Sequence, residues 1–197
     1  MNQAPRYRLP KGVAPIKGTD GRVFEPRVGF RVRLQAGARF THAFDVACSA
    51  DAVAPVFIAL VEAILPTTAY LIVEAEWRPE GPDVYLSDFL RRAEIEAILS
   101  KHLGLLVEDG MVAFGLAWYD AERLEEVFVD GHKSLTVFTS RPDVVRQRLQ
   151  SSGIDEAPDL ELLSEHGHAH LGGPDTSDIV TREIIEPLKM VLQPRAH

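Results

Sequence analysis

The sequence contains one cysteine, Cys48, among its 197 residues. A single cysteine cannot form an intramolecular disulfide, so the fold depends on non-covalent packing, as is typical of proteins in a reducing compartment. Long apolar runs are also missing, because the stretch from Val56 to Leu65 contains Glu62 and is about half as long as a membrane-spanning helix. Prolines interrupt the first thirty residues, which lack the apolar core of a secretion signal. We therefore expect a cytoplasmic protein that does not enter a membrane.

Signatures of the common enzyme classes are absent as well. The sequence has no GxGxxG after a strand pattern, no GxxxxGK[ST], no GxSxG, no HExxH and no pair of CxxC motifs. It has no internal repeat with a period of about 20 to 50 residues, which excludes solenoids and propellers. These absences favour a non-enzymatic protein over an enzyme of a known motif class.

The charge that is present is unevenly distributed. The chain has a net charge of −8, yet residues 1–40 contain nine Lys or Arg and only two acidic residues. We interpret residues 1–27, which are rich in Pro and Gly, as a basic arm, and residues 28–197 as a single acidic domain. Such an arm binds an acidic partner or nucleic acid, or lies on the acidic body of its own chain. The acidic domain itself repels nucleic acid.

Strand patterns dominate the middle of the chain. Apolar and polar residues alternate, as in half-buried strands, over residues 28–36, 39–47 and 69–77. Residues 111–119 are nearly apolar throughout, which predicts a central strand that is covered on both sides. Residues 125–139 form a hairpin pattern that turns at Asp130 and Gly131, because this pair readily adopts positive φ.

Helical periodicity predicts three main helices, near residues 51–65, 88–102 and 176–192. Asp51 and Ser87 stand where helix N-caps belong, whereas Pro187 should kink or restart the last helix. Strands outnumber helices in a mixed order, which favours the α+β class over regular βαβ alternation. We expect a predominantly antiparallel sheet of about five to seven strands packed by these three helices.

The segment SEHGHAHLGG contains the densest group of potential metal ligands. His166, His168 and His170 alternate, so an extended chain projects them from one side, and a bend at Gly167 lets them converge on zinc. The pattern is similar to the HxHxDH signature of metallo-β-lactamase-like hydrolases, but His170 stands where that motif has aspartate. The other interpretation is a solvated loop whose imidazoles offset nearby acidic groups.

Two further groups of polar residues attract attention. Glu74 and Glu76 share one face of a predicted strand, where paired carboxylates either act as acid and base or simply form an exposed outer surface. Asp130, His132 and Lys133 cluster at the predicted hairpin tip, for which a solvated turn is the simpler interpretation.

The stretch that begins at Met111, MVAFGLAWYDAERLEEVFVDGHKSLTVFTS, and continues to LLSEHGHAHL resembles small bacterial immunity proteins that neutralise polymorphic toxins. The resemblance covers residues 111–171 and is concentrated in EVFVDGHKSLTVFT. It implies a cytoplasmic protein that binds a cognate toxin domain, performs no chemistry and needs no cofactor. The negative domain suits a basic toxin domain as partner. The alternative function is a metal-dependent hydrolase that holds zinc with His166, His168 and His170.

Overall fold

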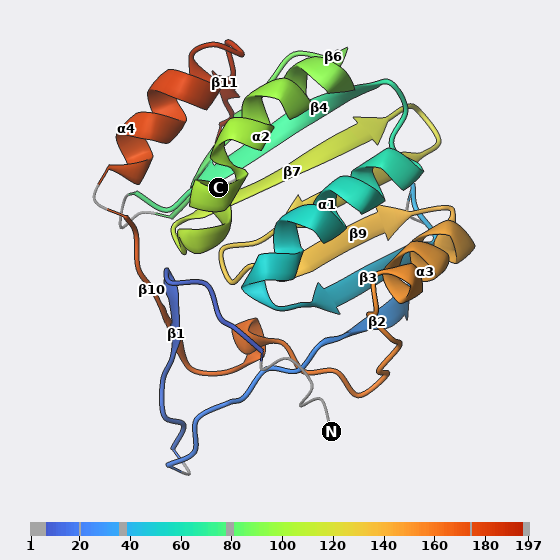
Figure 1. The fold of residues 1–197 in the computed structure, drawn as a ribbon. Helices are drawn as coiled ribbons and strands as arrows, with labels where there is room; N and C mark the ends of the chain where they lie inside the picture. Colours follow the sequence, from blue (N-terminus) through green and yellow to red (C-terminus); the bar gives the residue numbers. More distant parts are fainter. Residues whose placement is uncertain (1–6, 20, 36–38, 78–80, 174, 195–197) are drawn as a thin grey trace.

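The structure is a computed structural model that describes residues 7–19, 21–35, 39–77, 81–173 and 175–194 (Figure 1). Within these residues, nine strands form one large antiparallel sheet, and four α-helices lie together on one of its faces (Figure 1). The predicted α+β class and the predominantly antiparallel sheet are confirmed, although the sheet has more strands than the expected five to seven. None of the described helices is both long enough and apolar enough to cross a membrane.

The large sheet has the strand order β11–β5–β4–β7–β8–β9–β3–β2, and β6 pairs with the beginning of β4. The strands are β2 (Gly29–Leu34), β3 (His42–Ala47), β4 (Thr68–Ala75), β5 (Asp83–Leu86), β6 (Leu90–Arg91), β7 (Val112–Tyr119), β8 (Leu124–Val129), β9 (Leu135–Thr139) and β11 (Val191–Leu192). A separate antiparallel ribbon consists of β1 (Val13–Pro15) and β10 (His168–His170). This ribbon joins the N-terminal arm to the histidine-rich segment.

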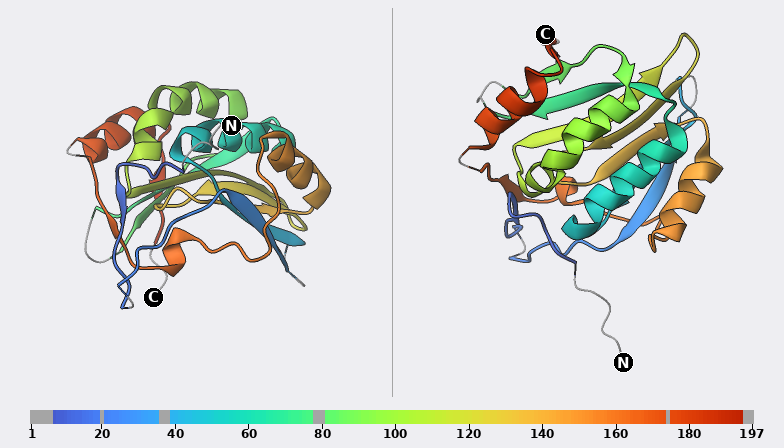
Figure 2. Two further views of the ribbon diagram at one scale, coloured as in Figure 1. Left: turned by 60° about the horizontal axis from the view of Figure 1, so that its bottom comes forward. Right: turned by 45° about the horizontal axis from the view of Figure 1, so that its top comes forward.

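Four helices cover one face of the sheet, which we call the covered face (Figure 2). They are α1 (Ala50–Ile64), α2 (Arg92–Glu108), α3 (Pro142–Ser151) and α4 (Thr176–Val180), the last continued by a π-helical turn, η2 (Thr181–Ile185). The core lies between the helices and this face; for example, Phe57 of α1 meets Phe114 of β7 edge to face, with ring centroids 5.2 Å apart. Such aromatic pairs add to the stabilisation that burial alone provides.

The helix predicted at 88–102 begins and ends later in the structure. Leu90 and Arg91 form β6 instead, and the hydroxyl of Ser87 accepts the backbone N–H of Leu71 in place of capping a helix. The helix then continues past Gly104 to Glu108. Sheet pairing therefore outweighs the capping signal at Ser87, because a buried strand N–H needs an acceptor.

The C-terminal helix is shorter than the predicted 176–192. Helical backbone ends at Ile185, two residues before Pro187, and residues 191–192 pair with β5 as the edge strand β11. Proline cannot donate a backbone hydrogen bond and its ring clashes with the preceding helical turn. The predicted interruption at Pro187 is therefore the end of the helix, and the chain continues into the edge strand β11.

Strand β7 is buried on both sides, yet helices lie on only one of them. Phe114 and Leu116 belong to the core beneath the helices, so Gly115 and its alternate neighbours face away from it. A Cβ atom at Gly115 would lie 2.6 Å from Cδ2 of Phe128, so the Phe128 ring rests directly on this glycine. The predicted central strand, covered on both sides, is confirmed, although on the side away from the helices it is neighbouring side chains that bury its small residues.

The face of the sheet opposite α1–α4, which we call the open face, is covered at one end only. Residues 155–165, which include the 3-10 turn η1 (Leu163–Glu165), pass below β2 and β3 (Figure 2, left). Leu160 packs against Ala47 there, and Arg31 donates to the Leu160 carbonyl and to Glu165. Within the part of the chain that the structure describes, no helix covers the open face of β4, β7 and β8.

The described part of the N-terminal arm lies on the acidic body. The Arg8 guanidinium is 2.7 Å from the Glu108 carboxylate, and the same carboxylate accepts the backbone N–H of Lys11. Further along, Arg27 pairs with Asp159 at 2.7 Å. The structure therefore shows intramolecular ion pairs with the acidic body for Arg8 and Arg27 of the arm.

Candidate functional site

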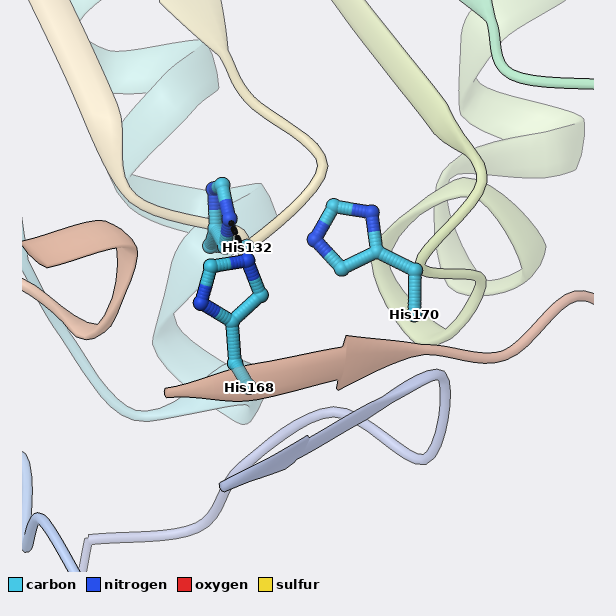
Figure 3. A group of neighbouring side chains, drawn as sticks. All are labelled: His132, His168 and His170. Atoms are coloured by element: carbon cyan, nitrogen blue, oxygen red, sulfur yellow. Dashed lines mark hydrogen bonds between the residues drawn. The ribbon is translucent and has the colours of Figure 1, made fainter. Parts of the chain in front are cut away.

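The structure brings together two of the three predicted metal ligands. His168 and His170 project from the same side of β10, as alternation along a strand requires (Figure 3). His166 lies outside this group: its ring stacks on Phe24 at 3.8 Å, and its Nε2 is 3.4 Å from Glu161. The turn η1 ends immediately before His166, so this residue is not part of the extended strand that aligns the other two.

His132 takes the third position in the cluster. It lies in the turn between β8 and β9, and its Nε2 is 2.8 Å from Nε2 of His168 (Figure 3). One ring nitrogen of each of His132, His168 and His170 lies within 4.8 Å of the other two. We call these three residues the histidine cluster. The sequence placed His132 at a hairpin tip, but gave no sign that the distant β10 segment folds against that tip.

The hairpin tip is more buried than the predicted solvated turn. Lys133 is 1% exposed, adopts a positive φ of 65°, and donates from Nζ to the carbonyl of Val112. Burial lowers the pKa of Lys133 to about 8, although Asp130 and Asp109 oppose this shift. The interpretation of Lys133 as a solvated residue was wrong, because β10 and the first residue of β7 enclose the turn.

Each imidazole of the histidine cluster has an oxygen atom next to its Nδ1. Nδ1 of His168 is 2.7 Å from the carbonyl of His166, and Nδ1 of His132 is 3.3 Å from Asp130. Nδ1 of His170 is 3.2 Å from the carboxylate of Glu76. Burial, followed by the charge of His132, lowers the pKa of His170 below its ordinary value. The neutral ring, which can act as a ligand, is therefore favoured at neutral pH.

The open face next to this cluster carries two carboxylates without a cation. Glu74 of β4 and Glu126 of β8 point to this face, and neither side chain has an ion pair or hydrogen bond with any described residue. Burial, together with the smaller effect of the charge of Glu74, raises the pKa of Glu126 to about 7. The pKa of Glu74 is also raised, mainly by burial and then by Glu76 and Asp130.

Aromatic side chains continue the open face away from the cluster. The ring of Tyr70 lies between Phe89 and Tyr119, at 5.0 Å from each centroid. Phe89 and Tyr119 are 46% and 44% exposed, so this stack presents apolar area to solvent. On β9, Phe138 contacts Phe40 at 4.6 Å. Acidic and aromatic side chains thus occur together on the uncovered part of the sheet.

Three comparisons, with protein-family models, with curated proteins and with solved structures, find no match to this chain.

Proposed function

We propose that this protein binds a basic protein partner on the open face of its sheet. The observation that supports the proposal most strongly is the pair Glu74 and Glu126, which are partly buried and have no cation among the described residues. A half-buried carboxylate without a partner costs stability when it ionises. Groups that lower the stability of the free protein are frequently functional, because a bound partner can form the interactions that they lack in the free protein.

A basic partner relieves this cost. A Lys or Arg side chain placed beside Glu74 and Glu126 favours the ionised carboxylates and forms charge-assisted hydrogen bonds with them. Complementary charge also accelerates the encounter and rejects partners with the same charge. The net charge of −8 extends this attraction over the rest of the protein surface.

The aromatic stack supplies the apolar part of the same interface. Tyr70, Phe89 and Tyr119 are large, have few rotatable bonds and are already held against one another. Tyrosine and phenylalanine are enriched in protein interfaces, where a few such residues contribute most of the binding energy. An acidic rim beside an aromatic patch therefore suits a protein better than a small molecule.

The resemblance of residues 111–171 to bacterial immunity proteins suggests the kind of partner. The proposed role is a cytoplasmic immunity protein that neutralises a cognate basic toxin domain by direct binding, without chemistry. Strands β7 and β8, which carry part of the open face, lie within this stretch. The resemblance and the uncovered acidic face therefore support the same function.

The alternative hydrolase relied on His166, His168 and His170 as zinc ligands. These three residues do not converge, because His166 stacks on Phe24. The hydrolase with this ligand set is therefore not supported, and we prefer protein binding because the open face carries Glu74 and Glu126 without a cation among the described residues. Nucleic-acid binding by the arm is also less well supported, since Arg8 and Arg27 are paired within the chain.

Calorimetric titration with the purified toxin-like domain encoded by the adjoining gene tests the proposal. We expect micromolar or tighter binding, and the double variant Glu74→Gln/Glu126→Gln should weaken it about 10- to 100-fold, or ~1.4–2.8 kcal/mol. Glu62→Gln is the control, because Glu62 is exposed on α1, on the opposite side of the sheet from the open face. The affinity of Glu62→Gln for the toxin-like domain should stay within about two-fold of that of the unmodified protein.

Failure to bind at micromolar concentration would remove the toxin-neutralisation proposal. Equal losses in the double variant and in Glu62→Gln would show that total charge, and not the open face, determines binding.

A further inference from the structure

The hydrogen bonds around the histidine cluster determine which ring nitrogens carry hydrogen. Each Nδ1 faces an oxygen acceptor, from the His166 carbonyl, Asp130 or Glu76. Because these oxygens can only accept, each Nδ1 must donate its hydrogen. The neutral form of each ring then presents a lone pair at Nε2.

Three lone pairs consequently face a common centre. Nε2 of His132 and Nε2 of His168 lie 2.8 Å apart. At this distance two lone pairs repel each other unless a proton or a metal ion lies between them. Nε2 of His170 is buried and has no hydrogen-bond partner among the described residues. Its ring points a nitrogen toward the other two rings (Figure 3). One added proton can bridge the first pair, but it leaves His170 unsatisfied.

We propose that His132, His168 and His170 bind one divalent transition metal ion of the zinc class through their Nε2 atoms. Zinc accepts nitrogen ligands at about 2.0–2.1 Å, which separates tetrahedral ligand atoms by about 3.3 Å. The separation between His132 and His168 needs to widen by only about half an ångström to reach this value. A single ion satisfies all three lone pairs and leaves a fourth position for water.

The surroundings favour zinc over ions that prefer oxygen. Asp130 and Glu76 contact Nδ1 atoms and therefore stand behind the ligands, not among them. Carboxylates in this position orient an imidazole and make its metal-binding nitrogen more basic. Magnesium and calcium require mainly oxygen ligands, and non-haem iron sites of the common facial type include one carboxylate ligand.

The ion connects two parts of the fold that are distant in sequence. His132 belongs to the turn between β8 and β9, whereas His168 and His170 belong to the ribbon formed by β1 and β10. Gly131 allows close approach, since its Cβ position is 3.0 Å from Cε1 of His170. Metal binding therefore fastens the ribbon, and with it the N-terminal arm, to the end of the large sheet.

Zinc titration of the full chain, purified without an affinity tag and freed of metal by a chelator that is then removed, tests this site. We expect one equivalent of zinc to bind, the thermal midpoint to rise, and the amides of residues 168–170 to exchange at least ten-fold more slowly. Cobalt(II) should bind at the same stoichiometry with the intense visible absorption of a tetrahedral site. Binding of substantially less than one equivalent, or an octahedral cobalt spectrum, would overturn the proposal.

Histidine variants separate the cluster from its sequence neighbour. His132→Ala and His170→Ala should each weaken zinc binding at least 100-fold. His166→Ala is the control, because its backbone carbonyl remains available to His168 while its ring lies outside the cluster. It should bind zinc within about three-fold of the unmodified protein.

Glu76→Gln should weaken zinc binding about 10-fold, since Glu76 positions the His170 ring without contacting the ion. Circular dichroism of each metal-free variant establishes that it is folded. If His166→Ala lost zinc as severely as His132→Ala, the ligand set would be wrong. Unchanged affinity in folded His132→Ala or His170→Ala would contradict the site equally.

Discussion

On the covered face, β7 and β8 present Phe114, Leu116 and Val127, which are fully buried beneath helices. On the open face, β8 presents Glu126 and Phe128, which remain partly exposed, and β7 presents Tyr119, which is 44% exposed. One set of strands thus serves two purposes through the alternation of its side chains. The covered face stabilises the fold. The open face retains charged and aromatic groups that lower the stability of the free protein, and a binding partner can offset this loss.

Truncation of a ring on each face should give the largest contrast between them. Phe114→Ala removes a fully buried ring that packs on Phe57, so we expect a loss of about 3–5 kcal/mol in the free energy of unfolding. Tyr119→Ala removes a ring that is 44% exposed and should cost about 1 kcal/mol or less. Urea denaturation measures both. Equal losses would show that the open face contributes to the core as the covered face does.

Adding a methyl group at Gly115 tests the packing of the open face on the strand β7 alone. A Cβ at this position meets the Phe128 ring at 2.6 Å and the Val127 carbonyl at 2.7 Å, so Gly115→Ala should cost about 1–3 kcal/mol. Gly104→Ala is the control within α2, where no atom lies within 4 Å of the added Cβ. It should stabilise the protein by about 0.5–1 kcal/mol. Stabilisation by Gly115→Ala would contradict the packing of Phe128 on β7.

Neutralising Glu126 should stabilise the free protein in a pH-dependent way. Its pKa rises from an ordinary 4.5 to about 7 in the folded state, so folding favours the protonated form. Stability from this group is present below pH 4.5 and is lost as the pH rises toward 7. Glu126→Gln should therefore add about 1–2 kcal/mol at pH 8, after allowance for solvent screening, and under about 1 kcal/mol at pH 5.

Urea denaturation at the two pH values measures this effect, with Glu62→Gln as the control that changes stability by less than about 0.5 kcal/mol. A gain in stability together with weaker partner binding is the pattern expected of a residue kept for function. Destabilisation by Glu126→Gln, or a gain that is independent of pH, would show that the carboxylate already has a compensating partner.

Periodicity was enough to predict the fold class and the faces of several strands. Alternation from Leu71 to Ala75 placed Glu74 opposite the core. The Asp130–Gly131 pair located the hairpin, but the positive φ expected of this pair occurs at Lys133 instead. The nearly apolar pattern of β7 correctly indicated a central strand buried on both sides, but periodicity could not indicate that the Phe128 ring, packed on Gly115, provides part of this burial.

The histidine cluster could be predicted only in part. Alternation correctly grouped His168 with His170, since both lie on one short strand. It could not indicate His132, because that contact depends on the pairing of β10 with β1 and on the position of this ribbon against the β8–β9 turn. The inclusion of His166 assumed an extended segment with a bend at Gly167, whereas the 3-10 turn η1 ends at Glu165, immediately before His166.

Methyl NMR of isoleucine-labelled protein tests the role of the open face most directly. Ile72 lies on the open face between Tyr70 and Glu74 of β4, whereas Ile58 is 36% exposed on α1 beyond the covered face. Addition of the basic partner should shift the Ile72 methyl resonances and leave those of Ile58 unchanged. Shifts at Ile58 with none at Ile72 would contradict binding on the open face.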